Sequence, residues 1–412
     1  MDKFEFAECV SQIDEKFIEE AQPPEENQIN IRRHKTPWAL IAACLFLVVA
    51  IPILVWNLKS NSGISNTDEL TTPKTPNIVK KVALITDCGT IDDKGYNQAC
   101  WEGTEQWCKE NNAEYTYYQP YEDSTDARKE AVAQAVSEGA NVIVMPGYLF
   151  GAVLYDIMEL YPDVYFIASD VGLGDITLDY VDYREPLANT ACMTFAEEQA
   201  GYLAGYAAVM EGYRNLAFYG GIVIPAVLRY SYGFVQGADA AAQELGVDIE
   251  IKYSYVGIFY CSSDEYIAKL ANWYSEGTEI AFVVGEGLEK LATKPAKKYN
   301  AKVIACDVDY THYDPCILTS ATKNLKKSVY DMLTELENGN WENYGGKFTN
   351  LTLFEGNNVL LPTGSDSWRF ENFTIAQYEE LVQNLRNGTL TVSADYEYMP
   401  EVSSYTTVIA IG

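Results

Sequence analysis

The chain is poor in the residues on which catalysis and metal binding most often depend. Only two histidines occur in 412 residues, His34 and His312, which argues against Ser-His-Asp triads and histidine-rich metal centres. Nine cysteines are scattered without a CxxC pair, so neither a zinc ribbon nor a redox dithiol is predicted. Cys306 and Cys316 flank a loop, where a disulfide is one alternative and two buried free thiols are the favoured one. We expect no metal and no cofactor.

Basic residues are also scarce relative to acidic ones. The chain has 29 Lys and Arg against 59 Asp and Glu, for a formal net charge of −30. Phosphate contacts need clustered basic side chains, so nucleic acid is not an expected partner. The hydrophobic share of 48% is enough for a well-filled core, and the length suits two or three domains.

One apolar run stands apart from the rest of the chain. The uncharged stretch WALIAACLFLVVAIPILVW, residues 38–56, is long enough to span a bilayer, and RRHK precedes it at 32–35. The positive-inside rule then predicts a transmembrane helix over 37–57, with segment 1–36 in the cytoplasm and the remainder outside the plasma membrane. Because "IAAC" resembles a lipobox, acylation at Cys44 is the alternative. The apolar run continues far past that residue, so we favour an uncleaved signal anchor.

The segments on either side of this run differ in character. Residues 1–22 place apolar side chains at near-helical spacing, which predicts an amphipathic helix. Residues 58–78 are rich in Ser, Thr, Asn and Pro, which is typical of a flexible linker.

From residue 79 onward, short apolar segments alternate with helical patterns. "VKKVALIT", "NVIVMPG", "VYFIASD", "NLAFYGG", "EIAFVVG" and "AKVIACD" read as buried strands, and segments such as "TDARKEAVAQAVSEG" read as helices between them. Repeated strand–helix units predict an α/β fold of parallel sheets covered on both faces. About 300 residues of such units exceed one comfortable sheet, so we expect two doubly wound lobes.

Polar residues and glycines follow several of these strands directly. Asp87 follows "VALIT", Asp170 follows "FIAS", Gly285 follows "AFVV" and Asp307 follows "VIAC". In open parallel sheets, ligands bind beyond the carboxyl ends of the strands. The pattern therefore predicts a ligand-binding cleft formed by these strand ends.

Several motifs, in order, resemble the basic membrane protein family of ABC-transporter solute-binding proteins, the purine-nucleoside-receptor type. They are "DCGTIDDKGYNQ", "VIVMPG", "FIASD", "EEQAGYLAGYAA", "FYGGIVIPAVLRYSYGFVQGADAA", "IACDVDY" and "ILTSATKN". The resemblance covers roughly residues 79 to 395. It implies a type I periplasmic-binding-protein fold, with two lobes joined by a hinge of three crossovers and a ligand held between them.

The resemblance also implies roles for particular residues. Tyr96 and Tyr230 stand where the family sandwiches a nucleobase between aromatic rings, and Asn97 occupies a further polar position. Carboxylates that bind ribose hydroxyls fall on Asp87, Asp170 and Asp307, the pocket lysine falls on Lys323, and Gly285 belongs to the glycine-rich turn. Two positions depart from the family pattern: Glu286 intrudes in that turn, and Gly95 replaces a Ser beside the stacking ring.

The chemistry of these residues agrees with the implied ligand. Aromatic stacking contributes about 1–3 kcal/mol per base, and charge-assisted hydrogen bonds from a diol to a carboxylate are roughly twice as strong as neutral ones. Acidic walls repel phosphate, so we expect nucleosides to be preferred over nucleotides. The spacing in "DCGTIDD" does not match a calcium loop, and no enzyme motif is present, although a glycosidase-type pair of carboxylates stays open as an alternative.

These patterns predict a membrane-anchored extracytoplasmic protein that captures nucleosides, purine ones first, for an ABC permease and its ATPase subunits. The alternative is a tethered nucleoside-type sensor that signals through its cytoplasmic segment, because that segment is longer than an anchor requires. The predicted parts are 1–36 as cytoplasmic segment, 37–57 as transmembrane helix, 58–78 as linker, 79–186 with 321–345 as lobe 1, 187–320 with 346–395 as lobe 2, and 396–412 as a tail without an assigned role.

Overall fold

The computed structural model describes residues 78–411, apart from 180, 258–263 and 286. The predicted cytoplasmic segment, transmembrane helix and most of the linker lie outside these residues. Among the helices that are described, none is both long and apolar enough to cross a bilayer.

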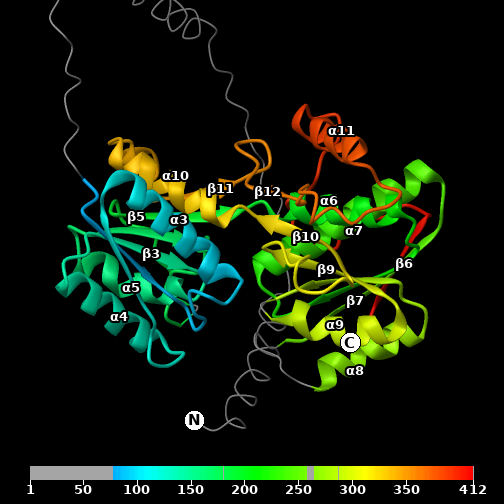
Figure 1. Ribbon diagram of the computed structural model, residues 1–412, viewed down its shortest axis with the longest axis horizontal. Helices are drawn as coiled ribbons and strands as arrows, with labels where there is room; N and C mark the ends of the chain where they lie inside the picture. Colours follow the sequence, from blue (N-terminus) through cyan, green and yellow to red (C-terminus); the bar gives the residue numbers. More distant parts are fainter. Residues whose placement is uncertain (1–77, 180, 258–263, 286, 412) are drawn as a thin grey trace, which may run out of the picture. The chain divides into compact units, whose positions relative to one another are not determined.

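The first sheet is parallel throughout. Its strand order is β11-β5-β4-β3-β1-β2, six strands within the described residues (Figure 1). The bounds are β1 Lys81–Ile85, β2 Glu114–Tyr118, β3 Val142–Pro146, β4 Tyr165–Ser169, β5 Thr190–Phe195 and β11 Lys347–Leu351.

Alternating side chains of this sheet enter two different cores. Leu84 of β1 and Val144 of β3 belong to the core that also holds Trp107 of α3, whereas Ile85 and Ile143 face the core with α4 and α5. Successive residues of a strand point to opposite faces, so both faces must be covered. The helices that cover them are α3 Tyr96–Asn111 and α10 Leu325–Glu337 on one face, and α4 Thr125–Ser137 and α5 Phe150–Leu160 on the other.

The second sheet has the order β12-β10-β9-β8-β6-β7-β13. Its neighbours are parallel except for β12, which runs antiparallel to β10. The bounds are β6 Asn215–Gly220, β7 Ile249–Tyr255, β8 Ile280–Val284, β9 Lys302–Asp307, β10 Ile317–Lys323, β12 Val359–Leu360 and β13 Thr406–Ala410.

Helices cover both faces of the second sheet as well. Phe218 and Phe282 face the core that contains Phe234 of α7, while Tyr219 and Val283 face the core with Trp273 of α8. The helices are α6 Glu197–Glu211 and α7 Pro225–Leu245 on one face, and α8 Asp264–Ser275 and α9 Leu288–Tyr299 on the other. A short 3-10 helix, η1 Trp341–Asn343, and α11 Ile375–Arg386 complete the set.

The chain passes between the two sheets three times, after β5, after β10 and after β11. This is the type I periplasmic-binding-protein architecture, with two doubly wound sheets and three crossovers. The predicted boundaries were 186, 320 and 345. The chain crosses to the other sheet later, after residues 195, 323 and 351, because it does so only at the ends of β5, β10 and β11. The C-terminal segment, to which the sequence assigned no role, contains β13, which pairs with β7 as an edge strand.

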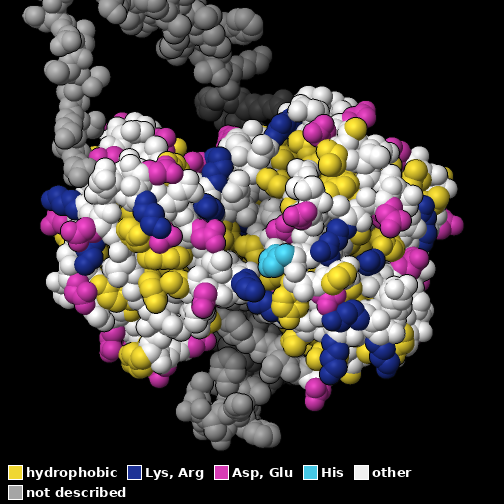
Figure 2. Space-filling model, in the orientation of Figure 1, with side chains coloured by type: hydrophobic (Ala, Val, Ile, Leu, Met, Phe, Trp, Pro, Cys, Tyr) yellow, Lys and Arg dark blue, Asp and Glu magenta, His cyan; other side chains and the backbone are white. Residues whose placement is uncertain are grey.

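Acidic side chains are spread over the face shown in Figure 2 and are interspersed with Lys and Arg.

Candidate ligand-binding site

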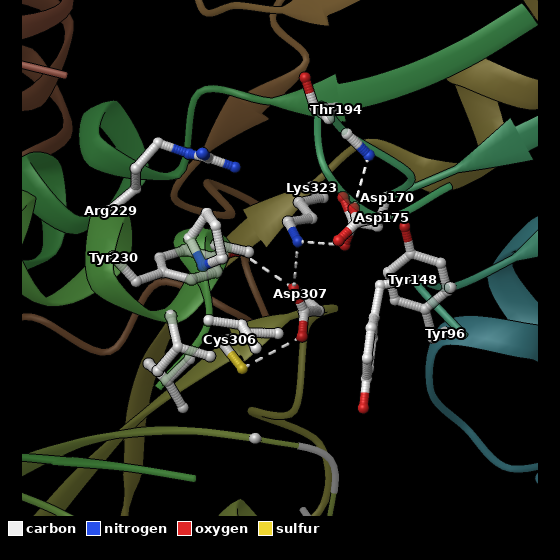
Figure 3. A pocket seen from close by; sticks show the side chains of 18 of the residues that line it. Tyr96, Tyr148, Asp170, Asp175, Thr194, Arg229, Tyr230, Cys306, Asp307 and Lys323 are labelled. Atoms are coloured by element: carbon white, nitrogen blue, oxygen red, sulfur yellow. Dashed lines mark hydrogen bonds and ion pairs between the residues drawn. The ribbon is translucent and has the colours of Figure 1, made fainter. Parts of the chain in front are cut away.

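A cavity of about 400 Å³ lies at the carboxyl ends of the strands, with walls from both sheets (Figure 3). Its position follows from the parallel strands, whose carboxyl ends meet at one edge of each sheet. Seven of the eight residues predicted for the site line it: Asp87, Tyr96, Asp170, Tyr230, Gly285, Asp307 and Lys323.

Lys323, the last residue of β10, is the centre of the site. Its Nζ lies 2.6 Å from Oδ2 of Asp170 and 3.2 Å from Oδ1 of Asp307, so one ammonium contacts a carboxylate from each sheet. A third carboxylate, that of the fully buried Glu197, lies 3.1 Å away. Three carboxylates around one buried cation form a compact ionic cluster.

The two aspartates of this cluster share an uncommon backbone conformation. Asp170 follows β4 with φ of 58°, and Asp307 ends β9 with φ of 64°. Left-handed backbone is costly for most residues, is tolerated by Asp, and gathers at binding sites. Each turn aims its carboxylate from the strand end into the cavity.

Burial and charge set the protonation of the cluster. Burial lowers the pKa of Lys323, but Asp170, Asp307 and Glu197 together raise it well above its ordinary value, so the ammonium stays charged. Burial raises the pKa of Asp170 to about 6 against the opposing effect of Lys323, with Glu197 and Asp307 adding to the rise.

Aromatic rings surround the ammonium. Lys323 Nζ lies 5.8 Å from the ring centroid of Tyr96 and 5.4 Å from that of Tyr230. In Figure 3, Tyr96 and Tyr148 lie on one side of Lys323 and Asp307, and Tyr230 lies on the other. Burial raises the pKa of the Tyr96 and Tyr230 phenols well above the usual value, so both hydroxyls are neutral. The rings therefore offer flat faces on two sides of a charged centre.

Hydrogen bonds fix the two predicted stacking rings. The Tyr96 hydroxyl lies 2.9 Å from Oγ of Ser169, and the Tyr230 hydroxyl donates to Asp307 Oδ1 at 3.2 Å and to the Ala321 carbonyl at 3.1 Å. Tyr230 is only 1% exposed. Its ring is held before any ligand enters.

Close helix packing carries Tyr230 to this position. A Cβ added to Gly201 of α6 would lie 2.1 Å from the Tyr230 carbonyl oxygen, and one added to Gly233 of α7 would lie 2.1 Å from that of Glu198. Only glycine permits such an approach, so the motifs "EEQAGYLAG" and "YGFVQG" bring the start of α6 and the ring of Tyr230 together.

The opening motif builds a rigid loop behind the cavity. Asp87 Oδ1 accepts hydrogen bonds from the N–H of Gly89 at 2.8 Å and from Nδ2 of Asn97 at 2.8 Å. Asn97 also donates to Asp93 at 2.9 Å, and Asp93 accepts N–H bonds from the first turn of α3. Asp93 is thus the turn and helix-start residue that its place in the motif suggests.

Asn97 differs from its predicted role. It is fully buried, and both its amide groups are engaged by the loop, with Oδ1 accepting from the Asp87 N–H at 3.2 Å. The residue does not line the cavity, because its side-chain amide forms hydrogen bonds with Asp87 and Asp93 of the loop.

Gly285 begins the turn between β8 and α9. Its φ is 144°, and an added Cβ would lie 2.8 Å from Cδ1 of Leu288. Glycine is required here on both counts. Glu286, the predicted departure from the family pattern, lies outside the described residues.

Several charged or aromatic residues of the cavity or the ionic cluster were not predicted, among them Tyr148, Glu197, Glu198, Arg229 and Glu289. Arg229 of α7 donates through Nε to Glu197 at 2.6 Å, and its Nε is 4.0 Å from Glu198. A sequence signal existed for the pair of glutamates, since they are the only charges near the start of an otherwise apolar helix. Tyr148 follows the Pro–Gly pair that ends β3.

The C-terminal segment also reaches the cavity. Ala394 and Tyr396 line it, and the guanidinium carbon of Arg229 lies 5.7 Å from the Tyr396 ring centroid. Gln236 of α7 holds this segment through two hydrogen bonds to the backbone of Ser393, at 2.8 and 3.0 Å. Tyr396, the first residue of the predicted tail, and Ala394, near the end of the predicted lobe 2, therefore supply part of one wall.

Both cysteines that flank the loop after β9 carry free thiols and are buried. The alternative of a Cys306–Cys316 disulfide is therefore wrong. Burial raises the pKa of the Cys316 thiol to about 12, so it behaves as a small apolar side chain.

The fold and the cavity together define a two-lobed α/β solute-binding protein. Residues 80–370 match the model of the family described as ABC transporter substrate-binding protein PnrA-like (Bmp), and the chain belongs to this family. The resemblance of the sequence motifs is confirmed.

Curated relatives are distant in sequence but cover most of the chain. The "ABC transporter nucleoside-binding protein BmpA" of Lactococcus lactis subsp. cremoris is 25% identical over 67% of this chain and 80% of that protein. The "CD4+ T-cell-stimulating antigen" of Listeria monocytogenes is 24% identical over 76% of this chain and 87% of its own length.

Solved structures share the fold. A solute-binding protein of an ABC transporter system from Conexibacter woesei gives a TM-score of 0.59 at 21% identity, covering 76% of this chain and 99% of that one. One from Aeropyrum pernix K1 gives 0.58 at 20% identity, covering 76% and 87%.

Proposed function

We propose that the protein captures nucleosides, purine nucleosides first, and delivers them to an ABC permease with its ATPase subunits. One observation carries the proposal: Asp170 and Asp307, from different sheets, meet at Lys323 between the rings of Tyr96 and Tyr230. Carboxylates bind the vicinal hydroxyls of a ribose, and aromatic rings bind the flat base. The relative named as a nucleoside-binding protein supports the same ligand class.

The charge of the cavity favours an uncharged ligand. Six acidic side chains line it, Asp87, Asp170, Asp175, Glu198, Glu289 and Asp307, against two basic ones, Arg229 and Lys323. A phosphate group would be repelled by this excess, so the proposal includes nucleosides and leaves out nucleotides.

We further propose that the chain is held at the plasma membrane by a single helix over 37–57, with its N-terminus in the cytoplasm and the binding lobes outside. The apolar run and its flanking basic residues support this placement. The family description favours transport over the sensor alternative.

Calorimetry on the full-length chain in detergent tests the ligand class. Adenosine, guanosine and inosine should saturate one site, whereas adenosine monophosphate and free ribose should bind at least about tenfold more weakly. Asp170→Ala should remove nucleoside binding, because it takes away one carboxylate and leaves Lys323 facing the ligand.

Asp163→Ala, at an exposed position before β4, serves as the matched control and should bind as the unchanged chain does. The absence of any saturable nucleoside binding to the unchanged chain would overturn the proposal. Release of free base from a bound nucleoside would point to an enzyme instead.

A further inference from the structure

Three carboxyl groups that line the cavity, those of Asp170, Glu198 and Glu289, each have a buried oxygen without a hydrogen bond, and of these only Glu289 forms no ion pair with another described residue. Glu289 lies in the first turn of α9 and lines the cavity, and the residue is only 1% exposed. Its Oε1 makes no hydrogen bond with any described residue. A buried acceptor without a donor is costly, so a ligand that donates a hydrogen bond to this oxygen would gain binding free energy.

The neighbours of Glu289 place it beside one of the stacking rings. The hydroxyl of Tyr310 interacts with the Glu289 carboxyl, and the same hydroxyl would lie 3.1 Å from a Cβ added to Gly95. Gly95 directly precedes Tyr96. Next along α9, Lys290 donates through Nζ to the Asp93 carbonyl at 3.2 Å, which fixes the start of α9 against the opening motif.

Gly95 therefore has a structural reason in this chain. A side chain there would crowd the hydroxyl of Tyr310, which is 5% exposed, and would require it to shift. The departure from Ser at this position and the presence of Tyr310 belong to one arrangement, in which a tyrosine hydroxyl and a glutamate occupy the corner next to the Tyr96 ring.

The charges around Glu289 are mixed. Burial raises its pKa to about 7, Lys290 and the Tyr310 hydroxyl oppose the rise, and Asp307 adds to it. No cation pairs with its carboxyl in the manner of Lys323, so a hydrogen-bond donor from a ligand is the partner that this corner lacks among the described residues.

Apart from the ribose 5′-hydroxyl, which all the nucleosides compared below share, the remaining donors of a nucleoside are on its base. The 2′- and 3′-hydroxyls of the ribose face Asp170 and Asp307 under the proposed function, on which this inference rests. A purine base then offers N–H groups at its edge: the exocyclic amine of adenine, the exocyclic amine and ring N–H of guanine, or the ring N–H of hypoxanthine. A base that stacks on Tyr96 presents that edge sideways, toward the corner that Tyr310 and Glu289 occupy.

We propose that Glu289 is a specificity-determining residue, which accepts an N–H donor from the edge of the bound base through its free Oε1. Tyr310 positions the carboxyl through its hydroxyl, and Gly95 leaves the space that this hydroxyl needs. The site thereby selects bases that carry a donor at this edge over bases of the same shape that carry none.

A pair of ligands isolates this contact. Adenosine and purine riboside share the ribose and the stacked rings, but purine riboside lacks the 6-amino group; guanosine and inosine form a second pair. Calorimetry on the full-length chain should give at least about tenfold tighter binding of one donor-bearing nucleoside than of purine riboside. Glu289→Leu should bring that ratio to within about twofold while leaving purine riboside binding nearly unchanged.

Glu289→Gln, which keeps the shape, gives a second measurement and should also shrink the ratio. Because both changes remove a buried carboxyl without a cation partner, the midpoint of thermal unfolding should rise or stay constant. Glu265→Leu, at an exposed position on α8, is the control and should leave the ratio intact.

Three results would count against the proposal. An unchanged ratio in both Glu289 variants would overturn it and leave the proposed function standing. Equal loss of all four ligands would show that Glu289 only maintains the fold. No nucleoside binding by the unchanged chain would overturn the proposed function, and this inference with it.

Discussion

The carboxyl groups around the cavity fall into two sets that differ in their cation partners. Asp170, Asp307 and Glu197 surround the Lys323 ammonium at 2.6 to 3.2 Å. Glu198 has only Arg229, at 4.0 Å, and Glu289 forms no ion pair with another described residue. An oxygen without a hydrogen bond does not separate the sets, because Asp170, Glu197, Glu198 and Glu289 each have one. Burial raises the pKa of Glu198 and Glu289 to about 7, whereas Asp170, opposed by Lys323, reaches about 6.

The difference indicates that the two sets of carboxyl groups have different roles in ligand binding. In the paired set, Asp170, Asp307 and Glu197, the Lys323 ammonium offsets part of the negative charge. The geometry of this set therefore exists before a ligand arrives, and binding requires little reorganisation. The lone set, Glu198 and Glu289, has no close cation among the described residues, so a hydrogen-bond donor of a ligand can offset its charge. Affinity should therefore depend mainly on the paired set, and discrimination between ligands on the lone set.

The largest expected effect comes from removing the cation of the paired set. Lys323→Met leaves Asp170 and Asp307 without their cation and Glu197 with Arg229 alone, so it should lower the free energy of unfolding by about 3–5 kcal/mol, with nucleoside binding lost. Urea unfolding at neutral pH measures the change. Lys327→Met, four residues later on α10 and 42% exposed in its side chain, should leave the unfolding midpoint unchanged. Equal stability of both variants would remove the distinction between the two sets.

A smaller effect is expected at the ring that lies between the sets. Tyr96 faces Lys323 on one side and follows Gly95, next to Tyr310, on the other. Tyr96→Ala should weaken adenosine binding by about 1–3 kcal/mol through lost stacking, whereas Tyr96→Phe should retain most of the affinity and lose only the hydrogen bond to Ser169. Calorimetry gives both values, and Tyr121→Ala, 69% exposed, is the control. Similar losses for Phe and Ala would mean that the hydroxyl, not the ring, holds the ligand.

The smallest effect is a pH dependence from the lone set. Burial, and then Glu197, raise the pKa of Glu198 from 4.5 to about 7, against the opposing effect of Arg229. The contribution of the protonated group to stability is complete below about pH 4.5 and is lost as the pH rises through 7. Glu198→Gln, which mimics the protonated form, should therefore gain stability relative to the unchanged chain over this range, by roughly 1–3 kcal/mol.

Urea unfolding at several pH values across this range follows the difference between the two proteins. A difference that stays constant with pH would show that Glu198 is ionised throughout and belongs with the paired set. If the stability advantage of Glu198→Gln appeared instead as the pH falls, the fold would favour the ionised form of Glu198, which also contradicts the prediction.

Much of the fold was accessible from the sequence. The alternation from residue 79 predicted parallel sheets, because strands buried on both faces read as continuous apolar runs. Asp87, Asp170 and Asp307 were found by their place directly after such runs, where parallel strands present their carboxyl ends. The rings of Tyr96 and Tyr230 came from the family resemblance, and both line the cavity.

The remainder depends on contacts between segments far apart in the chain. Glu289 reads as one more charge of an amphipathic helix, and only the turn at Gly285 shows that the first turn of α9 faces inward. Asn97 was predicted to line the cavity because of its place in the opening motif, yet its side-chain amide forms hydrogen bonds within the loop instead. Tyr396 follows a Thr- and Ser-rich stretch that resembles a tail, and Gln236 of α7 holds that stretch through Ser393, beyond the end of the family match. β13, still later in the chain, pairs with β7.

That last pairing has a practical consequence for producing the protein. β13 covers the outer edge of β7 over five residue pairs, from Thr406 with Ile249 to Ala410 with Tyr253. A shortened polypeptide that stops where the family match stops would present the uncovered N–H and C=O groups of β7 to any neighbouring molecule, an established route to aggregation. Recombinant versions should therefore retain the chain to its last strand.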